Sequence, residues 1–271
     1  MIKQILESPF VSDEYLQLIN QFEDQDHVII ENFKVNNKTA KNIGSRNLVD
    51  YRPNINISQN ILKENKVERI QFDSLHYFQI KELYSKIESS SFQCIKKDIS
   101  VNLQLPSSYE EYLVLLSKKR RHELKRKKRI FTDASKNFSL EQSNKEEILN
   151  AFIKQHQQSA GEKGSFMTKE NIEYFNCLFK IPGWKIYYLH SDLGDLAFAF
   201  VYESKEGIYL YNSSKNPNFD NLNSGIVLID LLIQKLINEK KLFFDFLKGT
   251  ERYKFDLGGN AVQLYDVDIK I

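Results

Sequence analysis

The stretch that decides the fold reads Phe243-Phe-Asp-Phe-Leu-Lys-Gly-Thr-Glu-Arg-Tyr-Lys254. Its first five residues are apolar except for one aspartate, and a glycine follows soon after, so the stretch predicts a short strand over Leu242–Leu247 that ends in a turn. The next residues predict a helical turn within Gly249–Gly258 and a last strand over Ala261–Ile269. The preceding segment Ser224–Lys240 is almost wholly apolar, which predicts a helix buried on most sides.

Three strand-like runs lie upstream of that helix. They cover Trp184–His190, Leu196–Glu203 and Ile208–Ser213, and hairpin turns at Asp192–Asp195 and Lys205–Gly207 join them. This arrangement is an antiparallel meander. A meander followed by a buried helix, a strand, a short helix and a strand is an α+β topology with a crossover after the third strand.

The segments just described resemble the GNAT-type acyltransferases of the CelD and FemABX-like group. The resemblance covers roughly Tyr109–Gly258, and it is most specific in the opening stretch. The other matching strings are Ser117-Lys-Lys-Arg-Arg-His-Glu-Leu-Lys-Arg126, Leu196-Ala-Phe-Ala-Phe-Val201 and Ser224-Gly-Ile-Val-Leu-Ile229. It implies the GNAT (acyl-CoA N-acyltransferase) fold, a mixed and mostly antiparallel sheet with flanking helices.

Members of this group look like two GNAT-like halves in tandem, the first of them degenerate. The resemblance therefore implies a degenerate half over residues 1–105 and an acyltransferase domain over residues 106–271. In the first half, strands are predicted at Val28–Phe33, Val67–Phe72 and Phe92–Leu105. A helix is predicted around Leu75–Glu88, and a long polar loop over Asn36–Ser58.

Composition excludes several classes of protein. Apolar residues make up 41% and charged residues 27% of the 271-residue chain, which is ordinary for a globular protein. Neither GxGxxG nor GxxxxGK[ST] occurs, so the common glycine-rich phosphate cradles are not expected. Cys94 and Cys177 lie in no CxxC motif, which argues against a zinc knuckle and a disulfide scaffold, and we expect both to be buried thiols. No metal site is expected.

The N-terminus lacks the apolar region of a signal peptide, and no stretch approaches 18 uncharged apolar residues. We therefore expect a soluble cytoplasmic protein.

The charge is concentrated in one segment. The chain has 38 basic and 36 acidic residues, but Ser117–Arg129 alone holds nine Lys or Arg against Glu123. A capping-box pattern over Ser108–Glu111 predicts a helix over residues 108–131 that contains this segment. Its apolar residues fall on one line at helical spacing, and Arg120 falls on the same line, so Arg120 is predicted to point toward the body of the protein.

Nine neighbouring cations repel one another, so an anionic partner for residues 117–129 is expected, although a solvated face is the simpler alternative. The candidates are a phosphorylated or nucleotide-linked acceptor, the phosphates of CoA, an RNA, and an anionic membrane surface. Arg120, Arg121 and Arg126 are the candidate substrate-binding cations. The segment lacks interleaved aromatic residues, which makes stacking on single-stranded bases the weakest option.

In the GNAT fold the fourth strand separates from the fifth, and acyl-CoA lies between them with its pyrophosphate at the next helix start. The resemblance places this site at Asn223, Ser224, Gly225 and Ile226, where Ser224 is able to cap the helix and Gly225 allows close approach of a phosphate. Typical family members have a Gln/Arg-x-x-Gly-x-Gly/Ala turn, whereas this chain has one glycine there. A capped core helix is the alternative.

Three candidate catalytic residues lie in the opening stretch. Asp245 is either a general base with a raised pKa or a residue that fixes the following turn. Tyr253 occupies the approximate position of the GNAT tyrosine that protonates the departing thiolate, and core packing is its alternative. Lys254 is expected to pair with Asp245 or a substrate anion, or else to be solvated.

Two further residues are candidates for substrate binding. His156 precedes a loop that the resemblance places near the acceptor site, although a histidine on a polar helix is more often on the surface. Glu251 belongs to the most specific string.

The resemblance implies transfer of an acyl group, foremost acetyl, from acyl-CoA to an amine or hydroxyl of a small or cell-envelope-precursor acceptor. An aminoacyl-tRNA-dependent transferase and a non-enzymatic polyanion-binding module remain alternatives.

Overall fold

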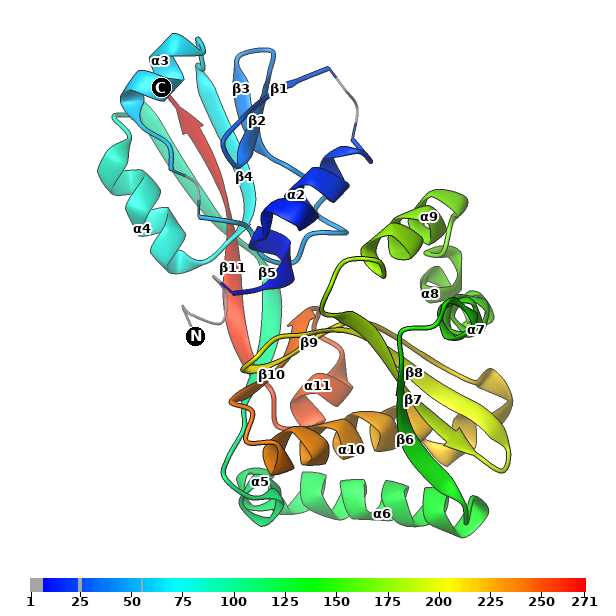
Figure 1. Cartoon of the computed structure of the whole chain (residues 1–271). Helices are drawn as coiled ribbons and strands as arrows, with labels where there is room; N and C mark the ends of the chain where they lie inside the picture. The colour runs from blue at the N-terminus through cyan, green and yellow to red at the C-terminus, as the bar shows by residue number, and fades with distance from the viewer. Residues whose placement is uncertain (1–6, 24–25, 55) are drawn as a thin grey trace. The chain divides into compact units, whose positions relative to one another are not determined.

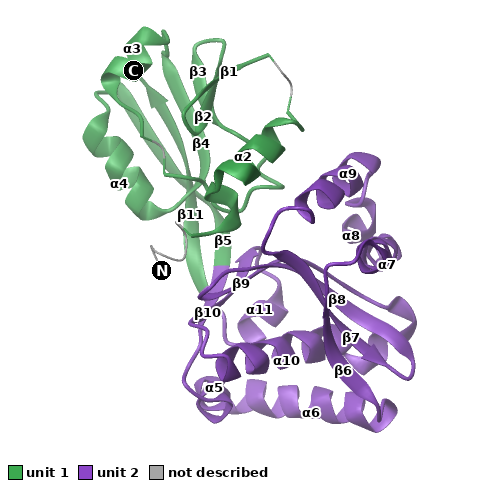
Figure 2. Ribbon diagram, in the orientation of Figure 1, with its two compact units in different colours: residues 1–100, 261–271 green, residues 101–260 purple. Residues whose placement is uncertain are grey.

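The computed structural model describes residues 7–23, 26–54 and 56–271. The chain divides into two compact units, unit 1 with residues 1–100 and 261–271, and unit 2 with residues 101–260 (Figure 2). The predicted boundary after residue 105 therefore lies five residues too late, and the predicted second domain wrongly includes the last eleven residues. Those residues pair with a strand of unit 1, which a pattern of local hydrophobicity does not reveal.

Unit 1 contains the strand order β1-β2-β3-β4-β11-β5 (Figure 1). Its strands are β1 (Val28–Ile30), β2 (Phe33–Asn36), β3 (Thr39–Asn42), β4 (Arg69–Leu75), β5 (Ser91–Gln104) and β11 (Asn260–Lys270). Its helices are η1 (Pro9–Val11), α2 (Asp13–Asn20), α3 (Gln59–Glu64) and α4 (Tyr77–Lys86). β3 and β4 are parallel, whereas β4 and β11 are antiparallel.

Two predictions for unit 1 need correction. The run Val28–Phe33 is two strands, because Glu31 takes a left-handed conformation (φ 49°) and reverses the chain. The predicted polar loop Asn36–Ser58 contains β3. Its residue Ala40 is fully buried, in a cluster with residues such as Phe33, Ile70 and Ile269.

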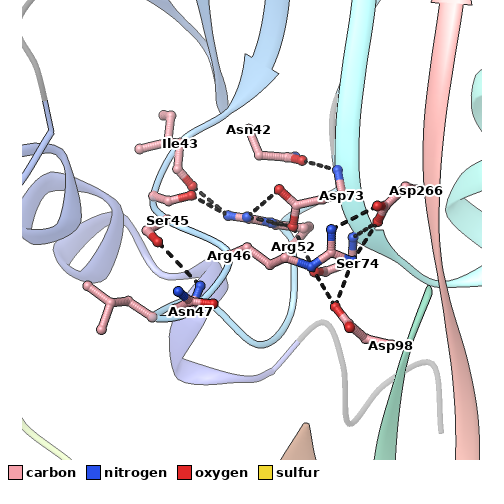
Figure 3. A network of polar contacts seen from close by, with 12 residues as sticks. Asn42, Ile43, Ser45, Arg46, Asn47, Arg52, Asp73, Ser74, Asp98 and Asp266 are labelled. Carbon is pink, nitrogen blue, oxygen red and sulfur yellow. Dashed lines mark hydrogen bonds and ion pairs between the residues drawn. The ribbon is translucent and has the colours of Figure 1, made fainter. Parts of the chain in front are cut away.

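Two arginines of unit 1 are paired with aspartates of the same unit (Figure 3). Arg52 has no exposed surface, and its Nη2 donates to both carboxylate oxygens of Asp73 at 2.7 and 2.8 Å. Arg46 joins Asp98 and Asp266 through donor–acceptor distances of 2.8 to 2.9 Å. These bonds tie the loop after β3 to β4, β5 and β11.

Unit 2 contains the strand order β10-β9-β8-β7-β6 (Figure 1). Its strands are β6 (Phe138–Ser143), β7 (Trp184–Ser191), β8 (Gly194–Glu203), β9 (Gly207–Lys215) and β10 (Phe243–Lys248). Its helices are α5 (Tyr109–Leu115), α6 (Lys118–Ala134), α7 (Glu146–Gln157), α8 (Glu162–Ser165), α9 (Lys169–Leu178), η2 (Pro217–Leu222), α10 (Ser224–Asn238) and α11 (Arg252–Asp256). The predicted meander and buried helix are confirmed, whereas β6 is an addition.

The predicted basic helix over residues 108–131 is two helices. Leu116 is extended (ψ 138°), and the Ser117 hydroxyl accepts a bond from the Arg120 amide at 3.3 Å, so a new helix begins there. Ser108 caps the first helix as predicted, by accepting from the Glu111 amide at 3.1 Å.

Three side chains differ from expectation. Arg120 reaches toward α11, where Asp256 lies at 3.6 Å, but its side chain stays 43% exposed, and the buried side of α6 is formed by Leu124 and Phe131. Lys128 reaches the fully buried Asp230 of α10 at 2.5 Å. Cys94 is exposed, since it lies in a solvent-facing part of β5, and Cys177 is half-buried.

Candidate functional site

The strands β9 and β10 are paired only at their beginnings. The described parallel register runs from Phe243 opposite Gly207 to Asp245 opposite Tyr209, and β9 continues for six residues beyond it. Both strands are irregular at that point. The β8–β9 register shifts beside Leu210, and Leu247 of β10 has a left-handed φ of 58°. Such irregularities bend a strand, so the two strands part beyond this point.

Asp245 stabilises the bend in β10. Its side chain is almost completely buried, and its Oδ1 accepts the Leu247 amide at 2.8 Å. A leucine at positive φ is unfavourable unless a neighbouring group holds it there. Of the two roles considered for Asp245, this contact supports the one in which the aspartate fixes the following turn.

The turn after β10 is built around an ion pair. Lys254 is 3% exposed, donates to the Lys248 carbonyl and pairs with Glu251 at 3.0 Å. The expectations of a solvated Lys254 or a pair with Asp245 are therefore wrong. Gly249 has φ 116°, and a Cβ there would lie 2.2 Å from a Glu251 oxygen, so glycine is required beside this pair.

The start of α10 leaves room beside its backbone. Asn223 is left-handed (φ 57°), and its carbonyl accepts from the amides of Ile226 and Val227 at 3.0 and 3.1 Å. Ser224 does not cap the helix as predicted, because it is buried and its hydroxyl donates to the Leu196 carbonyl at 3.0 Å. A Cβ at Gly225 would touch only Lys215, at 4.0 Å.

His156 lies inside the unit, so the surface alternative is wrong. It is 2% exposed between the rings of Phe152 and Phe166, with centroid distances of 5.8 and 5.9 Å. Its Nδ1 has no hydrogen-bond partner among the described residues. Burial, and to a lesser degree Lys163, lowers the His156 pKa to about 4. The ring is therefore neutral at physiological pH.

Lys163 of α8 experiences the charges of two other elements. Desolvation and Lys215 lower the pKa of Lys163 in α8, although its side chain is exposed, while Glu251 opposes the shift. The charges of Lys215, at the end of β9, and of Glu251, just before α11, therefore both affect the pKa of Lys163.

A groove runs between α6 and α11, with a volume of about 1130 Å³. Its lining residues, which define the α6–α11 groove, are Lys118, Lys119, Arg121, His122, Glu123, Lys125, Lys127, Arg252, Tyr253 and Asp256. A hollow of about 300 Å³ shares several of these residues and adds Arg120 and Ile226. Cations outnumber carboxylates in the groove, which therefore favours an anion.

The groove brings some predicted site residues together but not all. Arg120, Arg121, Tyr253 and Ile226 line the groove or the hollow. Arg126 lines neither, and its guanidinium pairs with Glu123 at 2.7 Å.

Tyr253 is the predicted catalytic residue that reaches this groove. It is half-buried, and its ring packs edge-on against Phe246 at 6.2 Å. Burial and the neighbouring Glu251 raise its pKa, so the phenol carries its proton at neutral pH. It is able to donate that proton, as a general acid must.

Sequence reasoning missed the roles of Lys163, Lys215 and Asp230. The signal for Asp230 was present, because a lone acid within an apolar helix needs a cation or donor, and Lys128 and Tyr109 supply them. Lys163 and Lys215 gave no such signal, since only the fold brings them together.

Within residues 7–23, 26–54 and 56–271, no group of three or more His, Cys, Asp or Glu residues is arranged to hold a metal ion. In the same ranges, no helix has the length and apolar character needed to span a bilayer.

Residues 118–255 match the model of the acetyltransferase (GNAT) domain. The match covers half of the chain, and the sheet order and the parting strands agree with it, so this chain belongs to the GNAT acetyltransferase domain family. The predicted fold class is thereby confirmed. No relative was found among curated proteins.

Three solved structures share the fold at low sequence identity. FemX matches with a TM-score of 0.61 and 9% identity, over 97% of this chain and 94% of that one. A conserved protein of unknown function from Bacteroides thetaiotaomicron matches with a TM-score of 0.59 and 11% identity, over 99% of this chain and 91% of that one. The C-terminal domain of a candidate lysylphosphatidylglycerol synthetase from Agrobacterium fabrum matches with a TM-score of 0.55 and 8% identity, over 96% of this chain and 90% of that one.

Proposed function

We propose that unit 2 transfers an acyl group from acyl-CoA, foremost acetyl-CoA, to an amine or hydroxyl of a small or cell-envelope-precursor acceptor. The observation that carries the proposal is the parting of β9 and β10 beyond Tyr209 and Asp245. A bound thioester in that opening would have main-chain amides on both sides. Such amides are suited to hold a carbonyl and to stabilise the developing oxyanion.

The anionic end of the donor would bind at the start of α10. The amide of Gly225 lies in the first turn, where the helix dipole favours a phosphate, and the backbone is open there. Lys215 lies beside Gly225, although its amine also pairs with Asp220. A phosphate would compete with Asp220 for this lysine.

We assign the chemistry to Tyr253 as general acid toward the leaving thiolate. The phenol carries its proton at neutral pH and lines the α6–α11 groove, from which it would donate that proton. Asp245 acts as a positioning residue, since its carboxylate holds the bend at Leu247 rather than facing the groove. Lys254 likewise fixes the turn that carries Tyr253. Glu251 and His156 would border the acceptor.

Thermal unfolding in the presence of CoA thioesters tests the proposal, because a ligand that binds only the folded state raises the midpoint. We expect acetyl-CoA or a related thioester to raise it, and the variant Gly225→Val to abolish the shift. Gly194→Asn is a matched control, since Gly194 lies in an open hairpin turn with φ 94° and nothing within 4 Å of its Cβ position. An unchanged shift in Gly225→Val would contradict the donor site.

Aminoacyl-tRNA is the second candidate donor, and the cations of the α6–α11 groove are the observation that favours it. In that case CoA thioesters would give no shift, and charged tRNA would bind with an affinity that falls steeply between 50 and 200 mM salt. Binding of polyanions without any acyl transfer would instead indicate a binding module.

A further inference from the structure

The end of α5 exposes two apolar side chains. Val114 is 71% exposed and Leu115 is 64% exposed, although Tyr112 and Leu116 beside them are buried. Because the buried face of α5 is already formed by these neighbours, the exposed pair takes no part in the core. The two acids of the first turn, Glu110 and Glu111, lie at the other end of the helix, and Glu111 bonds to Ser107.

A row of basic side chains follows directly. Lys118, His122, Lys125 and Arg129 are all exposed, and their spacing of four, three and four places them on one face of α6. The row is about 16 Å long, because Arg129 comes eleven positions after Lys118 and each step along a helix rises about 1.5 Å. Leu124 and Phe131 lie on the opposite, buried side. Lys118 comes three positions after Leu115, so the row begins within about 11 Å of the apolar pair.

Most cations of this row have no acidic partner. Among residues 7–23, 26–54 and 56–271, none of the carboxylates pairs with Lys118, Lys125 or Arg129, whereas Arg126 and Lys128 are paired with Glu123 and Asp230. Three cations of the row are therefore unpaired among the described residues, whereas the paired Arg126 and Lys128 lie elsewhere on the helix.

We infer that the end of α5 and the exposed face of α6 form a docking surface for an anionic phospholipid bilayer. Val114 and Leu115 would enter the acyl boundary, and the lysines and Arg129 would contact lipid phosphates. Peripheral binding requires this combination of buried apolar area and a basic face. An RNA would use the cations but would leave the apolar pair in water, so the lipid surface accounts for more of the observations.

The docking surface adjoins the proposed site. Lys118 and Lys125 also line the α6–α11 groove, where Tyr253 is found. Docking would bring that groove close to the lipid headgroups. The inference goes beyond the proposed function and does not depend on it, because binding to vesicles is measured without acyl donor.

Co-sedimentation with vesicles tests the inference. We expect the protein to bind phosphatidylcholine vesicles that contain phosphatidylglycerol, and not vesicles of phosphatidylcholine alone. Val114→Ser with Leu115→Ser should weaken binding to the mixed vesicles about tenfold, and it should leave binding to bulk tRNA unchanged. Lys118→Gln with Lys125→Gln should weaken binding to both.

Val28→Ser with Ile95→Ser is the matched control, because these exposed side chains of unit 1 (64% and 58%) are of similar size. This control should bind mixed vesicles as the wild type does. Circular dichroism verifies that each variant is folded. Equal binding by the wild type and Val114→Ser/Leu115→Ser would overturn the inference, and so would binding to tRNA alone, which would identify RNA as the partner of the basic row.

Discussion

The loop after β3 in unit 1 and helix α6 in unit 2 use charged side chains in different ways. In unit 1 the guanidinium of Arg52 is fully buried against Asp73, and Arg46 bridges two aspartates (Figure 3). In unit 2 only Lys128 of the basic helix α6 reaches a fully buried carboxylate, among the residues that the structure describes. Several of its other cations remain on the surface. Charges paired internally hold a fold together, whereas unpaired charges in one place are available to a ligand.

This contrast predicts where a substitution acts. A change at a paired charge in unit 1 should lower stability, and a change at the exposed face of α6 should lower binding. The predictions that follow test this division, beginning with the largest expected effect.

Arg52→Met should lower the free energy of unfolding by about 3–5 kcal/mol. Removal of one partner leaves Asp73 without its cation and the carbonyls of Ile43 and Gly44 without a donor. Urea unfolding followed by circular dichroism measures the change. Lys119→Met removes an exposed cation of α6 instead, and its effect should stay within about 0.5 kcal/mol.

The fluorescence of Trp184 separates the units in this experiment, because it is the only tryptophan and lies buried in unit 2. If the two units unfold separately, Arg52→Met should shift the circular dichroism transition and leave the tryptophan transition in place. A loss below about 1 kcal/mol would contradict a structural role for the pair.

Both units should lose stability in acid through one buried histidine each. Burial lowers the pKa of His76 in unit 1 to about 4, and burial with Lys163 lowers that of His156 in unit 2 to about 4. The unfolded chain takes up these protons near pH 6.5, and the folded chain does so near pH 4. Stability should therefore fall as the pH falls from about 6.5 to about 4, by up to about 3 kcal/mol for each histidine.

His76→Phe and His156→Phe should each flatten one part of this pH dependence. Stability is measured by urea unfolding at several pH values, with the exposed His190→Gln as control. A pH slope in this window that survives both substitutions would assign the effect to other groups.

The sequence was informative where a pattern repeats along one segment. The apolar run of α10 and the alternation in β7, β8 and β9 are local, so their positions were predicted closely. β6 was missed because its segment, Phe138-Ser-Leu-Glu-Gln-Ser143, has few apolar residues and sits at the edge of the sheet. The break before Ser117 is not predicted by the pattern, because the apolar line of residues 108–131 continues across it.

Long-range relations could not be predicted in this way. β11 lies next to the GNAT-like segment in sequence, but its register with β4 joins it to unit 1. Likewise, Asp245 was recognised as a notable carboxylate, yet its bond to the Leu247 amide depends on a left-handed residue that no local pattern marks. Residue types therefore indicated candidate residues, and the fold was needed to show which of them have structural contacts.

Tyr253→Phe should lower the rate of acyl transfer about 100-fold and change stability little. The phenol is the proposed proton donor, and a positioned acid contributes a factor of this order. Turnover of the CoA thioester identified by thermal shift is the measurement. Tyr188→Phe on β7 removes a comparable half-buried hydroxyl and should leave the rate unchanged. Equal rates for all three proteins would remove Tyr253 from the mechanism.

The smallest effect is expected at the ion pair on the surface of α6. Arg126 lowers the pKa of Glu123 to about 2 through their hydrogen bonds, which at first sight makes this pair resemble those of unit 1. Both side chains are 43% exposed, however, so solvent screens the attraction, and Glu123→Gln should change the free energy of unfolding by less than about 1 kcal/mol. Tryptophan fluorescence in urea measures this change.

The same variant, Glu123→Gln, removes a carboxylate from the α6–α11 groove and frees Arg126. Its affinity for polyanions should therefore rise slightly while its stability stays the same. A large loss of stability instead would mean that the cations of α6 serve the fold, and the contrast between the two units would fail.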